Sequence, residues 1–233
     1  MQRQYYFVRH AMPINDAGSF HLSAFDNDMQ GRQDQSLSVK GLRQAAALKD
    51  TVQRLDIQQI VSSTMKRAVE TAAVISQETG IVYNHQFTRL VEVAPGSYPI
   101  RRLSWMRFLL SKRWPDKLRR KFGVGLYYFL ASYYLIQWYR GKTQGGDSLS
   151  EIRQKIDEVL RILDSYSADR ILIVGHGYWI FLLGMRVLGR SRWNVFRLSW
   201  VVDYCSITRI DSNGHGNYQL RYFGVPYDSV SFS

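Results

Sequence analysis

The sequence predicts an α/β fold built on a largely parallel sheet. Over most of the 233 residues, short apolar strand candidates alternate with longer segments of helical period. Basic side chains follow three of these strand candidates, which is where ligands bind in parallel sheets. The chain is also long enough to bury a sizeable hydrophobic core.

The strand candidates are rich in β-branched and aromatic residues. They read QYYFVR (4–9), QQIVSS (58–63), RILIVGH (170–176), CSITRI (205–210) and YQLRYFG (218–224), with GIVYN (80–84) as a weaker sixth. Helical segments between the strands favour parallel pairing, because parallel neighbours need a long crossover connection.

Three helices are predicted around these strands. The first spans 38–55 with Ser38 as its N-cap, and the second spans 67–79 and stops at Gly80. Segment 177–189 is too apolar for a surface helix, so it should pack against the sheet.

A fourth helix has the clearest start signal, at Ser148. Ser148 and Glu151 have the spacing of a capping box, in which each side chain satisfies the other residue's backbone N–H. Apolar residues then recur along one face, at Ile152, Ile156, Val159 and Leu163.

The net charge of +12 is concentrated in one segment. Residues 101–142 hold eleven Lys or Arg and a single acid, Asp116, which gives this segment a net charge of +10. The rest of the chain is nearly neutral, so the overall basicity does not by itself indicate a nucleic-acid-binding protein.

Cysteine usage and the first residues favour the cytoplasm. Cys205 is the single cysteine, so an intramolecular disulfide is excluded and a reducing compartment is expected. The opening residues show no apolar run of signal-peptide length. Cys205 should pack as a small buried hydrophobe.

Three strand ends supply four basic side chains. Arg9 and His10 end the first strand. Arg67 follows the second strand, and His176 follows RILIV. Two guanidinium groups and two imidazoles close together favour a bound dianion, and the planar fork of arginine matches phosphate oxygens.

This cluster indicates phosphoryl transfer. An imidazole among cations is held neutral by like-charge repulsion, so its nitrogen can attack phosphorus. Expulsion of an alkoxide then needs a proton donor, and the candidate acid is Glu92 in RLVEVAPG.

The motifs resemble, in order along the chain, those of the histidine phosphatase superfamily, the phosphoglycerate mutase-like fold. They are the Arg9-His10 pair, QGRQDQSLSVKGLRQA, SSTMKRAVETA, RLVE, GGDSLSEIRQKI and VGHG. The matches run from residue 5 to about 210 and leave out the basic segment.

The resemblance implies a three-layer α/β/α sandwich around a mostly parallel six-stranded sheet. It implies that His10 is the transiently phosphorylated nucleophile, that His176 is a second catalytic histidine and that Glu92 is the proton donor. Arg9, Arg67 and His176 would bind the phosphate.

The sequence departs from the family pattern just after the nucleophile. Ala11 stands where the family has Gly, and AMPIN replaces a region that includes a phosphate-contacting Thr. Asn15 is the candidate for a replacement phosphate contact. Asp147, in GGDS, stands where Glu is commoner.

Residues 101–142 are an insertion within a single domain spanning 1–233, with eleven aromatic residues beside the eleven cations. The family places its variable substrate-covering segment here, so the first interpretation is a helical lid, which could also form a homodimer contact. A membrane-surface patch is the second interpretation and nucleic-acid contact the third. The dense apolar part is too short to span a bilayer.

The predicted function is hydrolysis of a phosphorylated small molecule through a phosphohistidine, independent of metal. His21, His85 and His215 lack metal-ligand spacing, and no nucleotide-cofactor motif is present. The catalytic alternative is phosphoglycerate mutase-type transfer. The alternative of another class is a non-catalytic phosphate-binding or membrane-surface module, and peripheral membrane attachment would accompany the cytoplasmic location in that case.

Overall fold

The computed structural model of the protein describes residues 2–14, 34–93, 133, 136–189, 202–214 and 216–230. The chain divides into two compact units. One unit comprises 1–16, 34–93 and 153–233 and holds the sheet, and the other comprises 17–33 and 94–152. Most of the predicted lid, residues 101–132, 134 and 135, lies outside the described residues.

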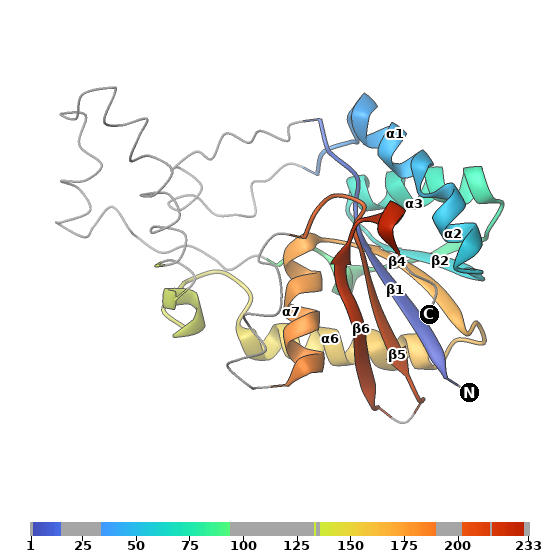
Figure 1. The fold of residues 1–233 in the computed structure, drawn as a ribbon. Coiled ribbons are helices and arrows are strands. Elements are labelled where there is room, and N and C mark those ends of the chain that lie inside the picture. The colour runs from blue at the N-terminus through green and yellow to red at the C-terminus, as the bar shows by residue number, and fades with distance from the viewer. Residues whose placement is uncertain are drawn as a thin grey trace, which may run out of the picture. The chain divides into compact units, whose positions relative to one another are not determined.

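Six strands form one sheet in the order β3-β2-β4-β1-β5-β6 (Figure 1). β1, β2, β3 and β4 pair in parallel, whereas β5 runs antiparallel to both β1 and β6. The predicted α/β class with a mostly parallel sheet is therefore confirmed. The strands are β1 Arg3–Arg9, β2 Gln59–Ser63, β3 Tyr83–Phe87, β4 Arg170–Gly175, β5 Ile207–Ser212 and β6 Tyr218–Val225.

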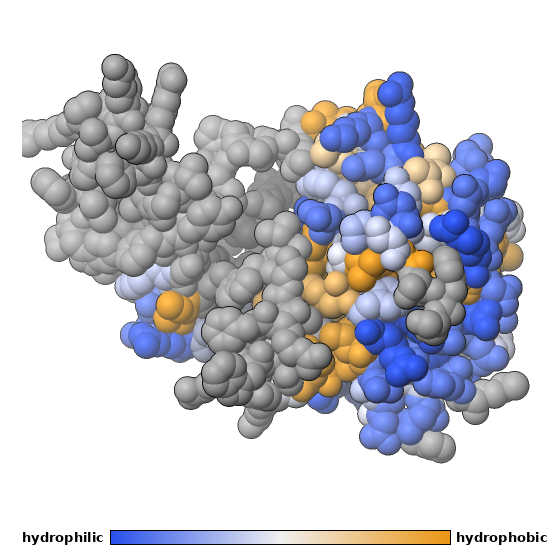
Figure 2. Space-filling view, viewed as in Figure 1, coloured by the Kyte–Doolittle hydropathy of each residue, from blue (hydrophilic) through white to orange (hydrophobic). Residues whose placement is uncertain are grey.

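Helices cover both faces of the sheet (Figure 1). On one face lie α1 Val39–Ala47, α2 Lys49–Arg54 and α3 Lys66–Thr79, and on the other lie α6 Leu149–Asp164 and α7 Gly177–Leu188. The short 3-10 turns η3 Thr88–Leu90 and η5 Tyr227–Ser229 complete the described elements. Figure 2 shows hydrophilic residues over α2 and apolar ones gathered over α7, while the surface over α1 is mixed, with Val39 and Leu42 exposed.

The central strand β1 shows why the fold has three layers. Its side chains alternate between the two faces, as the pleat of a strand requires. Tyr6 and Val8 join the core that includes α1 and α3. On the other face the ring of Phe7 stacks on Trp179 of α7, with 5.8 Å between the ring centroids. The strand is consequently buried on both sides and can hold the residue that follows it rigidly.

Most predicted helix signals are confirmed. The Ser38 hydroxyl accepts the Gly41 N–H as an N-cap, and Gly80 ends α3 in the left-handed conformation, with φ of 75°. At the start of α6, Glu151 accepts the Ser148 N–H at 2.7 Å, and the Ser148 hydroxyl accepts the Glu151 N–H at 3.2 Å. The predicted apolar face of α6 is buried, namely Ile152, Ile156, Val159 and Leu163.

Three predicted boundaries were wrong. The single helix expected over 38–55 is broken at Leu48, whose N–H bonds to Ala45 O and so closes the last turn of α1 early. The weak strand 80–84 begins only at Tyr83, because the left-handed turn at Gly80 comes first. The strand predicted from Cys205 begins at Ile207, although Cys205 is buried as expected.

The described helices include none that is long and apolar enough to cross a bilayer.

Candidate active site

Three neighbouring strands deliver the predicted basic residues to one edge of the sheet. His10 follows β1, His176 follows β4, and Arg67 lies in the first turn of α3, directly after β2. Because β2, β4 and β1 are adjacent and parallel, their carboxyl ends meet. We call His10, Arg67 and His176 the strand-end cluster. All three are buried, with exposed fractions of 8% or less.

The hydrogen bonds of His10 define which ring nitrogen is free of a proton. Its Nδ1 lies 2.8 Å from the carbonyl oxygen of Ala11. A carbonyl can only accept, so Nδ1 carries the proton. Nε2 therefore presents a lone pair, which accepts the Nε–H of Arg67 at 3.0 Å. The neutral ring is held in the tautomer that a nucleophile at Nε2 requires.

His176 is held between Ser63 and Arg67. Its Nε2 lies 2.9 Å from the hydroxyl of Ser63, the last residue of β2, and its Nδ1 lies 3.3 Å from Nη2 of Arg67. Since a guanidinium only donates, Nδ1 accepts and the Nε2–H donates to Ser63. The two imidazole centroids are 5.2 Å apart. Glu92 Oε2, 3.8 Å from His176 Nδ1, brings the candidate acid to the same place.

Burial keeps both imidazoles neutral. It lowers the pKa of His10 to about 3, and the charges of Arg67 and then Arg9 act in the same direction, against the hydrogen bond to Ala11. The pKa of His176 is lowered well below its usual value, first by burial and then by His10, Arg67 and Arg9. The repulsion expected from the sequence is present, but desolvation is the larger cause.

Arg9 is oriented by the turn that precedes β5. Its Nη1 donates to the carbonyl of Val202, and its guanidinium carbon lies 3.8 Å from the ring centroid of Tyr204. Its Nε is buried and has no hydrogen-bond partner in the described part of the chain. A buried donor of this kind is available to an acceptor such as a phosphate oxygen.

The start of α1 supports the backbone just after the nucleophile. The carbonyl of Met12 accepts both the N–H and the hydroxyl of Ser38, while its N–H donates to Gln44. A Cβ on Gly41 would lie 2.1 Å from the Met12 carbonyl oxygen, so only glycine fits there. The Ser, Gly and Gln of the motif SLSVKGLRQ are thus explained by their contact with the backbone of one residue, Met12.

The structure therefore brings together most of the predicted site residues: Arg9, His10, Arg67, Glu92 and His176. Asn15 lies outside the described residues. Two contacts were missed. Ser63 was visible within the motif SSTMKRAVETA but carried no assigned role. Tyr204 had no signal, because the direction of β5 could not be deduced from the sequence. Within the described ranges, no three His, Cys, Asp or Glu are grouped to hold a metal ion.

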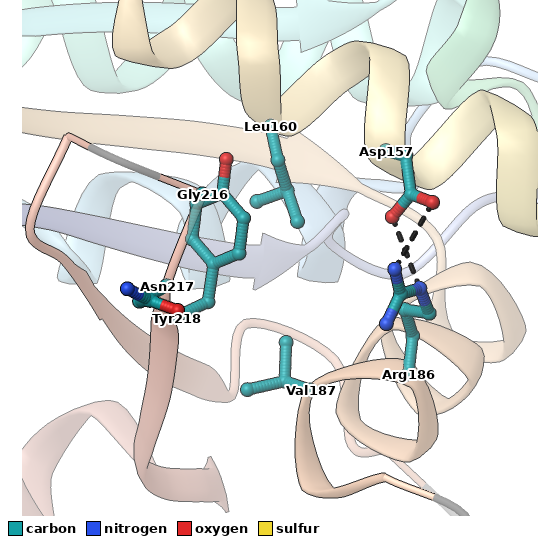
Figure 3. Close-up of a pocket in the computed structure, with 7 residues that line it drawn as sticks. All are labelled: Asp157, Leu160, Arg186, Val187, Gly216, Asn217 and Tyr218. Atoms are coloured by element: carbon teal, nitrogen blue, oxygen red, sulfur yellow. Dashed lines mark hydrogen bonds and ion pairs between the residues drawn. The ribbon is translucent and has the colours of Figure 1, made fainter.

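A separate cavity of about 230 Å³ lies beside the C-terminal end of α7 (Figure 3). Arg186 forms two contacts with Asp157 of α6 across this cavity, at 3.0 and 3.1 Å. We call it the α6–α7 cavity. It is lined by Asp157, Leu160, Arg186, Val187, Gly216, Asn217 and Tyr218.

The sheet order and the two histidines beside an arginine define the phosphoglycerate mutase-like class of α/β proteins. The chain belongs to the histidine phosphatase superfamily, branch 1, whose sequence model matches residues 5–118 and 131–224. Members of this superfamily are phosphatases or mutases, as the names of the relatives illustrate.

A relative from Salmonella typhi, named "Probable phosphoglycerate mutase GpmB", is 29% identical over 216 residues, covering 89% of this chain and 84% of the relative. Among solved structures, a mycobacterial glucosyl-3-phosphoglycerate phosphatase with inorganic phosphate matches with a TM-score of 0.66 and 19% identity, covering 98% of this chain and 100% of its own. The phosphoglycerate mutase from Bacillus anthracis matches with a TM-score of 0.65 and 19% identity, over 96% and 93%. At such identities the two structures support the fold alone.

Proposed function

We propose that this chain hydrolyses phosphomonoesters of small molecules through a phosphohistidine at His10, without a metal ion. The observation that carries the proposal is the tautomer of His10. Its Nδ1 proton is committed to the Ala11 carbonyl, so Nε2 offers a lone pair at the centre of a buried basic cluster. A buried neutral imidazole beside guanidinium groups is suited to attack a phosphate dianion that those groups bind.

In the first step, His10 Nε2 attacks phosphorus, so the P–N bond forms while the P–O bond to the leaving group breaks. The entering phosphate takes the place of His10 Nε2 as acceptor for the Arg67 guanidinium. Glu92, protonated, gives its proton to the leaving alkoxide. The negative charge that collects on the equatorial oxygens is stabilised by Arg9 and Arg67, and by His176 once its Nε2–H turns from the Ser63 hydroxyl to a phosphate oxygen.

In the second step, water attacks the phosphorus of the phosphohistidine. Glu92, now a carboxylate, takes a proton from the water as the O–P bond forms. The P–N bond breaks and returns its electron pair to His10 Nε2, which restores the starting tautomer. Inorganic phosphate leaves, and Glu92 has regained its proton for the next cycle.

The test is turnover of p-nitrophenyl phosphate in excess EDTA, with capture of an acid-labile, alkali-stable phosphoenzyme on denaturing gels. We expect His10→Ala to lose both, with turnover falling about 10⁴-fold or more, as for other lost nucleophiles. His85→Ala is the matched control, because His85 is an exposed histidine on β3. Wild-type inactivity across acidic to neutral pH, or equal activity of His10→Ala, would contradict the proposal.

Mutase activity is the second candidate, and the name of the Salmonella relatives favours it. A mutase must hold a bisphosphorylated intermediate long enough to return the phosphoryl group, whereas a hydrolase releases it to water. Incubation with 3-phosphoglycerate, followed by ³¹P NMR, separates the two reactions. Appearance of 2-phosphoglycerate ahead of inorganic phosphate would identify the mutase.

For residues 101–142, the proposal is that their positive charge favours anionic substrates or an anionic surface. Liposome sedimentation tests the membrane alternative. Wild type should pellet with anionic vesicles, and a variant with the Lys and Arg of this segment neutralised should not. Equal and negligible pelleting of both proteins would remove that alternative.

A further inference from the structure

The turn before β5, residues 202–206, contacts both the backbone and the side chain of Arg9. The Arg9 carbonyl accepts the Cys205 N–H at 3.0 Å, and the Arg9 N–H donates to Ser206 O. Ser206 N–H also closes the turn onto Asp203 O. Cys205, with φ of 59°, occupies the position of this turn that favours glycine. A cysteine in that conformation persists because it is fully buried and hydrogen-bonded to Arg9.

The left-handed turn at Cys205 directs the preceding side chain, Tyr204, onto Arg9 and His10. The Tyr204 ring lies against the Arg9 guanidinium, 3.8 Å from Cζ to the ring centroid, which is a close cation–π contact. The same ring lies 5.6 Å, centroid to centroid, from His10. One aromatic side chain therefore touches both the predicted nucleophile and its neighbouring arginine.

Arg9 has little freedom on its other sides. A Cβ on Gly177 would lie 3.2 Å from Arg9 Cδ and 3.3 Å from Arg9 Nε, so the start of α7 approaches the side chain closely. Nη1 donates to Val202 O. The orientation of the guanidinium plane then leaves Nε as the buried donor without a partner among the described residues. The Tyr204 ring covers the face of that plane.

We infer that Tyr204 is a positioning residue for the reaction proposed above: its ring fixes the plane of Arg9 so that Nε donates to the substrate phosphate. The inference rests on the proposed function, but it concerns a residue outside the matched motifs. Because the ring acts through its face, the inference depends on the electron density of the ring.

The experiment replaces Tyr204 by phenylalanine and then by mono-, di- and trifluorinated phenylalanines through codon suppression. Fluorine withdraws density from the ring face while nearly preserving its shape, so the variants should fold alike, which circular dichroism checks. Tyr204→Phe is the reference for the fluorinated variants in kcat/KM for p-nitrophenyl phosphate. The trifluoro variant should lose about tenfold relative to Tyr204→Phe, about 1.4 kcal/mol, with a parallel rise in the inhibition constant of inorganic phosphate.

Two controls make the result specific. The same series at Tyr166, whose ring lies near Phe87 and His85, should leave kcat/KM unchanged. In an Arg9→Met background, fluorination at position 204 should have no further effect, because a double-mutant cycle isolates the Tyr204–Arg9 pair. The inference would be overturned if kcat/KM did not change along the fluorinated series at position 204. It would also be overturned if kcat/KM fell equally with fluorination in the wild-type and Arg9→Met backgrounds.

Phosphate binding separates this inference from the proposed function. Affinity for inorganic phosphate, measured by thermal shift, reports on Arg9 even where no turnover occurs. An inactive wild type whose phosphate affinity falls along the fluorinated series would refute the hydrolase and support Tyr204. An active wild type whose phosphate affinity does not change along the series would support the hydrolase and refute the role of Tyr204.

Discussion

The strand-end cluster and the α6–α7 cavity each hold an arginine beside a partner, yet only one has the properties of a reacting centre. In the cavity, Arg186 pairs with the carboxylate of Asp157 (Figure 3). Both side chains are substantially exposed, at 47% and 39%. In the cluster, buried Arg67 donates to one imidazole nitrogen and lies within hydrogen-bond distance of another. An exposed ion pair has nearly no net charge, and its two groups interact only weakly in water. Buried imidazoles beside guanidinium groups, in contrast, have a lowered pKa. Free volume is thus a poorer guide to the chemistry than the burial of titratable groups.

Removing each arginine in turn should give the largest difference between the two regions. Arg67→Met should lower kcat/KM for p-nitrophenyl phosphate about 10³-fold, because it removes a preorganised donor to the developing charge. Arg67→Lys should recover only part of that loss, since a lysine lacks the planar fork. Arg186→Met removes the same group from the α6–α7 cavity and should change kcat/KM less than twofold.

Thermal melts accompany these arginine variants, so that a folding defect is recognised. A loss below tenfold in folded Arg67→Met would place the phosphate elsewhere. An equal loss in Arg186→Met would mean that the α6–α7 cavity takes part in turnover.

The positions of the cluster residues could be predicted because they follow strands. Parallel neighbours bring their carboxyl ends together, so motifs that are distant in the chain, such as those of His10 and His176, meet in space. The tautomer of His10 could not be predicted, because it depends on one carbonyl, Ala11 O, whose direction is set by the packing of α1. Ser63 and Ser62 are equally polar in the sequence, and only the pleat of β2 turns Ser63 toward His176.

The contact of Tyr204 with Arg9 and His10 could not be predicted from the sequence, for a related reason. Its place at the active edge needs β5 to run antiparallel to β1, and it needs Cys205 to adopt a left-handed turn for which cysteine gives no signal. The late start of β3 has a different, local origin, since the turn at Gly80 delays a strand whose apolar residues begin earlier in the sequence. Tertiary context decided the place of Tyr204, whereas local pattern decided the caps and the buried faces.

The comparison extends to the acids of the two regions. Glu92→Gln should lower kcat/KM about 100-fold for an alkyl phosphate such as glycerol phosphate and less than fivefold for p-nitrophenyl phosphate. The difference arises because nitrophenolate leaves without help, whereas an alkoxide needs the proton. Asp157→Asn, the matched change in the α6–α7 cavity, should leave both substrates unaffected. An equal loss on both substrates in Glu92→Gln would exclude Glu92 as the proton donor to the leaving group.

The smallest expected effect is a loss of folding stability at acid pH, caused by the buried, neutral His10. The folded-state pKa of His10 is lowered to about 3, so below pH 6.5 the unfolded chain binds a proton at this residue that the folded chain does not. The free energy of unfolding should therefore fall as pH falls from 6.5 toward 3, by at most about 1.4 kcal/mol per pH unit for each such histidine.

In urea titrations at pH 6.0 and 5.0, His10→Asn should lose less stability over that interval than wild type, by about 1 kcal/mol. His85→Asn, changed at an exposed position, should match the wild-type difference. Equal pH dependence in all three proteins would mean that His10 is protonated as readily in the folded chain as in the unfolded one, and the neutral nucleophile on which the strand-end cluster depends would be lost with it.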